Sequence, residues 1–325
     1  MTNGWVEAMR AGDFARAWAI NDEDLATSGY PPKHTGPRHL QRIWRGESLA
    51  NKHVLVRCYH GLGDTIQFLR FMQPLRGIAR SVTVWCQPEL LPLVERTAGA
   101  DCALALHSGT PEADFDVDIE IMEVPHALRV GREEIEMSAP YLTLPPRSMP
   151  VSLDCEGLAV GLVWEVGQWD KRRAVLPALL RRLAVPGVAL YSLQREAATE
   201  ELAQIGARDI STPDIAALGR LLCQLDLVIC VDTMVAHLAG ALGCEAWVLL
   251  HADCDWRWPS SGCRTFWYPS LRLFRQKTAG DWGAVILEVR RALQERVRCE
   301  QKVTQYHLAD ATAPLVNSSC TGRRP

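Results

Sequence analysis

The stretch that most constrains the fold of this chain is residues 53–71, which read HVLVRCYHGLGDTIQFLRF. The apolar run at 54–56 predicts a buried strand, Gly61 and Gly63 predict a tight turn, and apolar residues at helical spacing then predict a helix. In a parallel sheet, such a helix presents the free N–H groups of its first turn at the carboxyl edge. We therefore expect a ligand to bind at this turn.

Asp64 lies in the turn and has two candidate roles. A carboxylate at the carboxyl edge of a parallel sheet is well placed to act as a general base. Aspartate is also a favoured residue for capping a helix N-terminus. The residues alone leave both roles open.

The length and composition indicate a globular protein with two domains. A chain of 325 residues is long for one hydrophobic core, and 48% hydrophobic with 22% charged residues is ordinary for a soluble protein. The net charge of −3 gives no reason to expect nucleic acid as a partner. The most apolar region, residues 218–250, is interrupted by Arg220, Asp226 and Asp232, so we expect no membrane span.

The eleven cysteines are scattered and include no CxxC pair. The N-terminus has no basic start followed by an apolar core, so we expect no signal peptide and predict reduced thiols in a cytoplasmic protein. The nearest approach to a metal-binding set is His251, Cys254 and Cys263, with Cys244 upstream. Their spacing matches no zinc template, so we expect no metal.

Residues 1–50 are predicted to be a helical N-terminal appendage. Residues 8–20 (AMRAGDFARAWAI) indicate a short amphipathic helix pair broken at Gly12 and Asp13, similar to half of a tetratricopeptide unit. One such unit cannot bury its own apolar face. It should therefore dock on the main body or continue the array of a protein partner.

The rest of the chain is predicted to form two Rossmann-like domains, 51–148 and 149–298, with a linker at 145–150 and a disordered tail at 299–325. Predicted strands are 81–86, 102–106, 115–121, 158–164, 188–193, 227–231 and 247–250. Predicted helices are 88–96, 177–183, 199–204, 214–224 and 281–297. Alternating strands and helices favour parallel sheets covered on both faces. Two such domains leave a cleft between their carboxyl edges, where ligands bind.

A second polar turn leads into a helix of small residues at 232–243 (DTMVAHLAGALG). Asp232 or Thr233 can cap this helix, and its free N–H groups and dipole favour a diphosphate. His237 lies about one turn into the helix. It is either a site residue or a structural histidine.

A third candidate segment, residues 164–173 (WEVGQWDKRR), follows a predicted strand. Lys171 and Arg173 can stabilise the charge on a leaving phosphate, or the segment is an ordinary solvated charge run. The tryptophan-rich stretch 253–268 either stacks on the rings of a ligand or fills space between the domains.

Together these segments resemble the ADP-heptose lipopolysaccharide heptosyltransferase family, glycosyltransferase family nine, and most of all the branch often fused to tetratricopeptide repeats. The matching segments are RCYHGLGDTIQFLRF (57–71), VGLVW (160–164), SLQ (192–194), LDLVICVDTMVAHLAGALG (225–243), DWRW (255–258) and WYPSLRLFRQ (267–276).

The resemblance implies a GT-B fold, in which two Rossmann-like domains face a central cleft and bind the acceptor and the nucleotide-sugar respectively. It implies an inverting, metal-independent glycosyltransferase with no cofactor, an ADP-linked donor, and a saccharide, protein or small-molecule hydroxyl as acceptor. The implied catalytic residues are Asp64 as general base and Arg173. The implied donor-binding residues are Trp164, Lys171, Gln194, Asp232, Thr233, Met234 and His237. The implied acceptor-binding residues are His60, Gly61, Gly63 and Gln67.

The chain also departs from the family pattern. Ala174 replaces a common serine, Glu165 replaces a small residue, and Cys244 with Glu245 replaces a basic residue and a proline. The first domain is also shorter than in the lipopolysaccharide enzymes. These departures are the basis of an alternative function, a non-catalytic or repurposed GT-B module that binds a protein partner through the appendage and the tryptophan-rich stretch.

Overall fold

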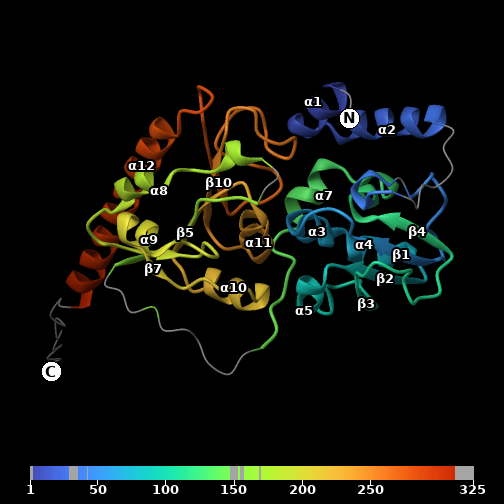
Figure 1. Ribbon diagram of the computed structural model, residues 1–325, viewed down its shortest axis with the longest axis horizontal. Coiled ribbons are helices and arrows are strands. Elements are labelled where there is room, and N and C mark those ends of the chain that lie inside the picture. Colours follow the sequence, from blue (N-terminus) through green and yellow to red (C-terminus); the bar gives the residue numbers. More distant parts are fainter. Residues whose placement is uncertain are drawn as a thin grey trace, which may run out of the picture.

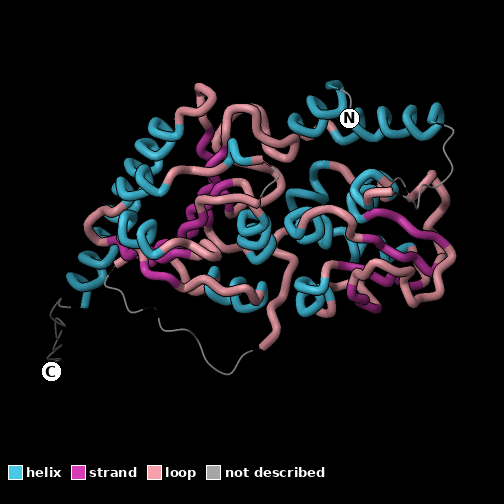
Figure 2. The backbone as a smooth tube through the Cα atoms, in the orientation of Figure 1, coloured by secondary structure: helices cyan, strands magenta, loops and turns pink. Residues whose placement is uncertain are grey.

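The structure is a computed structural model that describes residues 3–28, 36–41, 43–146, 153, 157–167 and 170–311, with side chains as far as residue 301. The described chain forms two sheets, each covered by helices, and a helix pair at the N-terminal end (Figure 1). Figure 2 shows the strands inside each half of the molecule, with helices around them. This is the α/β class that the alternating pattern predicts.

The first domain contains a four-stranded parallel sheet in the order β3-β2-β1-β4. Its elements are β1 (His53–Arg57), α3 (Leu62–Phe68), α4 (Met72–Ile78), β2 (Ser81–Cys86), α5 (Leu91–Val94), β3 (Cys102–Ala105), β4 (Val117–Glu120), α6 (Val124–Ala127) and α7 (Arg132–Met137). The strand order reverses between β1 and β4. Ligands of open parallel sheets bind outside the carboxyl ends of the strands at such a switch point.

The second domain contains a six-stranded parallel sheet in the order β10-β9-β8-β5-β6-β7. Its elements are β5 (Leu158–Val163), α8 (Pro177–Leu180), β6 (Val188–Ser192), α9 (Thr199–Ile205), β7 (Arg208–Asp209), α10 (Ile215–Leu222), β8 (Leu227–Val231), α11 (Met234–Leu242), β9 (Ala246–Leu250), β10 (Leu271–Arg275) and α12 (Trp282–Ala311). Here the order reverses between β5 and β8, which places the second switch point at their carboxyl ends.

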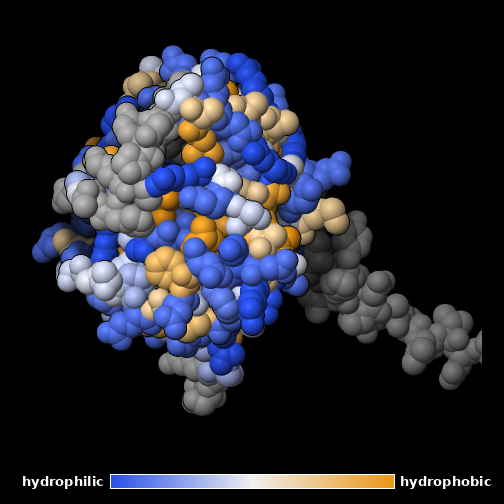
Figure 3. Space-filling view, turned by 90° about the vertical axis from the view of Figure 1, so that its right-hand side faces the viewer, coloured by the Kyte–Doolittle hydropathy of each residue, from blue (hydrophilic) through white to orange (hydrophobic). Residues whose placement is uncertain are grey.

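The central strands of the second sheet show why this fold could be predicted from the sequence. Every residue of β5, β8 and β9 is buried, and each strand is a continuous apolar run. Such runs are typical of parallel strands with helices on both faces. The exposed face of the first domain is mostly hydrophilic, with apolar side chains scattered among polar ones (Figure 3), as on most globular proteins.

Several parts of the chain differ from the predicted elements. The helices α4, α6 and α7, the short strand β7 and the edge strand β10 were not predicted. The helix α12 runs to Ala311. The first part of the tail, which was predicted to be disordered from residue 299, is therefore helical. Residues 298–311 contain no proline or glycine and several good helix formers, so nothing in them ends the helix. Residues 312–325, and most of the predicted linker at 145–150, lie outside the described residues.

The N-terminal appendage consists of α1 (Asn3–Ala11) and α2 (Phe14–Ser28), broken at Gly12 with φ +72° as predicted. Both helices dock on the main body. In α2, Trp18 Nε1 donates to the carbonyl oxygen of Val130 in the first domain at 2.8 Å. In α1, the ring of Trp5 packs edge-on against Trp256 of the second domain, with centroids 5.0 Å apart. The appendage therefore contacts both domains.

Candidate active site

The two switch points face each other where α3 packs against α11, at the centre of the molecule (Figure 1). Each of these helices directly follows a strand at its switch point, so the turns before the helices converge. Gly63 in α3 makes the closest approach. A Cβ atom there would lie 2.9 Å from His237 Cδ2 and 3.4 Å from Met234 Cα, so only glycine fits without movement.

The capping role expected for Asp64 has a geometric basis, and its role as general base stays a prediction. Asp64 Oδ2 accepts a hydrogen bond from the Gly61 N–H at 2.8 Å, which is the capping contact. Its other oxygen, Oδ1, accepts a short hydrogen bond from Arg257 Nη2 of the second domain. The Asp64 side chain keeps 24% of its surface exposed, so it is not sealed from a ligand.

Arg257 is a functional candidate to which the sequence assigned no role. Its Nε donates to Gln67 Oε1 at 2.8 Å and its Nη1 donates to Asp255 Oδ1 at 2.7 Å. The guanidinium lies 4.1 Å from the centroid of the Trp256 ring. Burial acts to lower the pKa of Arg257, but the carboxylates of Asp64 and Asp255 outweigh it and raise the pKa, so the side chain is a buried cation.

Asp232 lies just beyond β8 and is only 4% exposed. Burial, together with the nearby charge of Asp255, raises the pKa of Asp232 to about 6, against the opposing effect of Arg173. Arg173 Nη1 donates to the backbone oxygen of Asp232 at 3.0 Å and lies 3.7 Å from its Oδ2. The cation and the carboxylate are therefore side by side at the second switch point.

Several buried polar atoms at the two switch points have no hydrogen-bond partner within the described parts of the chain. These atoms are Gln67 Nε2, Arg173 Nε and Asp232 Oδ2. Buried polar groups in proteins are nearly always paired, so unpaired ones at the same site call for a specific explanation. A polar ligand or ordered water between the domains would satisfy them.

The remaining residues of the α11 motif are structural in their contacts. Thr233 caps α11 through a hydrogen bond from the Val235 N–H to Oγ1, at 3.3 Å. His237 is buried, with Nδ1 3.0 Å from the Tyr268 hydroxyl and its ring stacked on Trp258 at 5.7 Å. Burial holds the pKa of His237 well below its ordinary value. The ring is therefore neutral.

The loops after β5 and β6 bring together the other residues predicted to bind a nucleotide-sugar. Gln194 Oε1 accepts hydrogen bonds from the backbone N–H groups of Trp164 and Glu165, at 3.2 and 2.9 Å. The Trp164 side chain is buried in the core of the second domain. Glu165 and Lys171 are exposed, and Lys171 Nζ lies 3.4 Å from the backbone oxygen of Val166.

Glu120 is a second carboxyl group that the sequence did not single out. It ends β4, is 3% exposed, and accepts hydrogen bonds from the N–H groups of Tyr59 and Met122. Burial raises the pKa of Glu120 well above its ordinary value. His60 Nε2 lies 4.0 Å from Glu120 Oε2, and burial lowers the pKa of His60. Glu120 thus fixes the loop that carries the predicted acceptor-binding residues.

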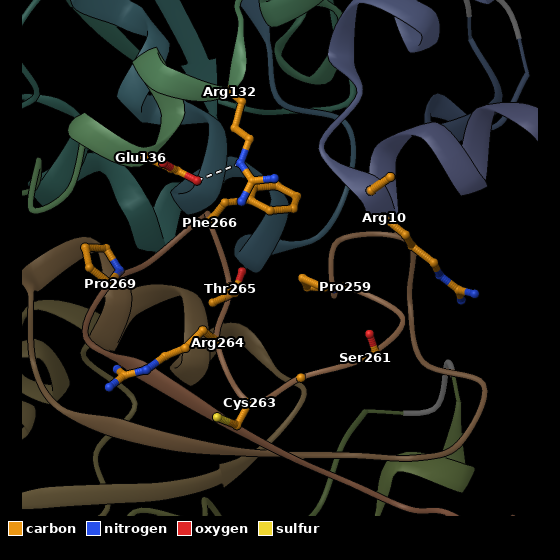
Figure 4. Close-up of a pocket in the computed structure, with 12 residues that line it drawn as sticks. Arg10, Arg132, Glu136, Pro259, Ser261, Cys263, Arg264, Thr265, Phe266 and Pro269 are labelled. Carbon is orange, nitrogen blue, oxygen red and sulfur yellow. Dashed lines mark hydrogen bonds and ion pairs between the residues drawn. The ribbon is translucent and has the colours of Figure 1, made fainter.

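Two cavities lie near the site, but neither is lined by Asp64 or Asp232. The larger, about 670 Å³, lies between α1, α7 and the loop at 259–269. In Figure 4 the Arg132 guanidinium there lies against Phe266 and is joined to Glu136, so it is already engaged. The smaller, about 480 Å³, is beside the end of β1 and is lined in part by Arg57 and Tyr59.

Among the residues that the structure describes, no group of three or more histidine, cysteine or acidic side chains lies together as a metal site would require. No helix in the described part of the chain is long and apolar enough to cross a bilayer.

The fold defines a class: two Rossmann-like units with facing carboxyl edges, which is the expected GT-B arrangement, and a helical N-terminal part beside them. No protein-family model and no curated protein matches this chain. Similar solved structures include a family 9 glycosyl transferase from Veillonella parvula, 11% identical with a TM-score of 0.47, over 71% of this chain and 87% of that one.

Two proteins from E. coli are also similar. ADP-heptose lipopolysaccharide heptosyltransferase II is 15% identical with a TM-score of 0.49, over 75% of this chain and 99% of that one. The iron-containing dodecameric glycosyltransferase TibC is 14% identical with a TM-score of 0.49, over 73% of this chain and 65% of that one.

Replacing Gly63 by alanine should loosen the contact between the domains. The added methyl group meets the buried His237 ring, and overpacking of this kind costs about 1–3 kcal/mol of unfolding free energy. The matched control is Gly77→Ala in α4, where a Cβ meets nothing within 4 Å and about 0.5–1 kcal/mol should be gained. Urea unfolding measures both, and equal behaviour of the two variants would contradict the close approach.

Asp232 should make the protein less stable as pH rises. Its pKa of about 6 in the folded state exceeds the ordinary 3.8, so the folded state binds the proton more tightly. Unfolding free energy should therefore fall between about pH 4 and 6.5, by up to roughly 3 kcal/mol. In Asp232→Asn this fall should be absent when urea unfolding is measured at several pH values.

The control for this pH profile is Asp101→Asn. Some burial acts to raise the pKa of Asp101, but the Val82 N–H and Arg76 lower it overall. Its contribution is therefore lost as pH falls, which is the opposite sign. A wild-type profile that Asp232→Asn leaves unchanged would show that Asp232 has an ordinary pKa.

Proposed function

We propose that the protein is an inverting glycosyltransferase that moves a sugar, heptose or a similar one, from a nucleotide-diphosphate donor to a hydroxyl acceptor without a bound metal. One observation carries the proposal. Asp64 on the first switch point is bonded to Arg257 of the second domain, and Arg173, Asp232 and the N-terminus of α11 meet at the second switch point.

The second switch point has the charges that a leaving diphosphate needs. In the proposal the diphosphate lies at the N-terminus of α11, whose dipole favours an anion. Arg173 is held beside that terminus by the Asp232 backbone oxygen, and its buried Nε is unpaired among the described residues. Lys171 is exposed close by in sequence and adds a second cation. Fixed cations at a developing charge do the work that a metal does elsewhere.

Asp64 is the proposed general base. One of its oxygens stays with the Gly61 N–H and keeps the turn in place. The acceptor hydroxyl takes the position of Arg257 at the other oxygen, and Arg257 turns to the diphosphate. Asp64 then removes the proton as the hydroxyl oxygen attacks the anomeric carbon and the bond to the diphosphate breaks, which inverts that carbon.

The acceptor belongs to the first switch point in this proposal. His60, Gly61 and Gly63 form the turn there, and the cavity of about 480 Å³ beside β1 begins at the neighbouring Tyr59. The unpaired Gln67 Nε2 faces the domain boundary and can donate to a sugar or acceptor oxygen. An ADP-linked donor is proposed from the sequence resemblance.

The first test is a thermal-shift screen with ADP, UDP, GDP and their sugars, each with and without magnesium. A ligand at a hundred times its dissociation constant should stabilise the protein by about 2.7 kcal/mol. We expect a shift with one nucleotide that magnesium does not change, and a smaller shift in Arg173→Gln, because a hydrogen bond to a charged group contributes about 1.5–3 kcal/mol. No shift with any nucleotide would contradict the proposal.

Asp64→Asn tests the base. The amide keeps an oxygen for the Gly61 N–H but cannot take a proton, so turnover with the nucleotide-sugar found in the screen should fall about 10²–10⁴-fold. Calorimetry should show nucleotide binding preserved. Asp101→Asn, which removes a carboxylate paired with Arg76 on the surface, should keep full turnover. Full activity in Asp64→Asn would exclude the assignment.

A further inference from the structure

Two cysteines that play no part in the proposed reaction lie against each other. Cys223 and Cys244 have their sulfur atoms 3.4 Å apart. Cys223 is exposed and Cys244 is partly exposed, so solvent reaches the pair. No motif in the sequence relates them, since 21 positions separate them along the chain.

Helix ends hold both thiols in place. Cys223 is the C-cap of α10, and its N–H donates to the Gly219 oxygen at 3.1 Å. Cys244 follows Gly243, the left-handed residue with φ +75° that ends α11, and its N–H donates to the Ala239 oxygen at 2.9 Å. A disulfide has a sulfur separation of about 2.05 Å, so the atoms need to approach by only about 1.4 Å.

The pair also differs chemically from other cysteines of the chain. A hydrogen bond from the Cys244 thiol lowers the pKa of Cys223 to about 7, so much of Cys223 is thiolate at neutral pH. Burial raises the pKa of Cys58, Cys86 and Cys230, which are inert thiols in the cores. Cys223 therefore combines exposure, a thiolate and a neighbouring thiol, as redox-reactive cysteines do.

We propose that Cys223 and Cys244 are a redox-active pair that a peroxide oxidises to an intrachain disulfide. The Cys223 thiolate attacks one oxygen of hydrogen peroxide, the O–O bond breaks, and hydroxide leaves, which converts Cys223 to a sulfenic acid. The Cys244 sulfur then attacks the Cys223 sulfur, gives up its proton, and releases the sulfenic oxygen as water. In sum, two thiols lose two electrons and two protons, and one peroxide becomes two waters.

The disulfide would join two parts of the second domain that lie close to the boundary between the domains. The loop that it closes contains β8, Asp232 and α11. The chain leaving the first domain also rests here, because the N–H groups of Tyr141 and Leu142 both donate to the Ala241 oxygen. Linking α10 to the end of α11 constrains the unfolded chain, so the disulfide should raise the melting temperature by several degrees.

The test treats the full chain with a small excess of hydrogen peroxide and maps it by mass spectrometry after digestion without reduction. The expected product is a Cys223–Cys244 peptide pair lighter by two hydrogen atoms, which separates again on reduction, and two fewer titratable thiols. The melting temperature of the oxidised protein should rise and return on reduction. Linked chains, or oxidation at Cys102 with none at Cys223, would overturn the proposal.

Variants separate the two steps. In Cys244→Ser, peroxide should leave a Cys223 sulfenic acid that dimedone traps, and the rise in melting temperature should disappear. In Cys102→Ser, which removes an exposed cysteine of the first domain, the disulfide should form as in the wild type. Iodoacetamide labelling of the unmodified protein needs no variant: Cys223 should react at least several-fold faster than Cys102 at pH 7, and equal rates would contradict the thiolate. None of these results depends on transferase activity.

Discussion

The contact between α3 and α11 determines how the rest of the structure is arranged. At Gly63 the helices approach so closely that a single added carbon would meet the His237 ring. Each helix begins at the switch point of its own sheet, so this one contact brings both carboxyl edges together. Two buried arginines then cross the boundary in opposite directions. Arg257 reaches Gln67 and Asp64 from the second domain, and Arg70 reaches the Trp267 oxygen from the first.

The positive charges of these two buried arginines are stabilised in different ways. A buried cation is costly unless its hydrogen bonds and charge are satisfied. Arg257 has carboxylates on two sides, whereas Arg70 lies 4.7 Å from the ring centroids of both Tyr141 and Tyr268 and donates to carbonyl oxygens. Aromatic faces attract a cation without adding a charge. Arg70 therefore joins the domains through carbonyl oxygens and aromatic faces, and Arg257 joins them through carboxylates and the Gln67 amide oxygen.

The sequence predicted the features that depend on local order, and the structure shows why. β2 and β8 begin and end at the predicted residues, because β2 has buried apolar residues at alternating positions from Val82 and β8 is a continuous apolar run. The edge strand β10 was not predicted because Arg272 and Arg275 interrupt its apolar pattern. The pairing of Arg257 with Asp64 was not predicted for another reason. Arg257 lies 193 positions from Asp64, and no local pattern reports a pairing over that distance. The tryptophans beside it are packed between the appendage and both domains.

The pairing of Arg257 with Asp64 also links events at the two switch points. Asp64 accepts one hydrogen bond from the Gly61 N–H and one from Arg257, and each of its oxygens keeps a lone pair for a further donor. In the proposed reaction, an anion at the second switch point attracts the Arg257 guanidinium and leaves Asp64 to the acceptor hydroxyl. Under that proposal the two binding events favour each other, and linkage requires that each strengthens the other by the same factor. One buried side chain is sufficient for this coupling, without any movement of the sheets.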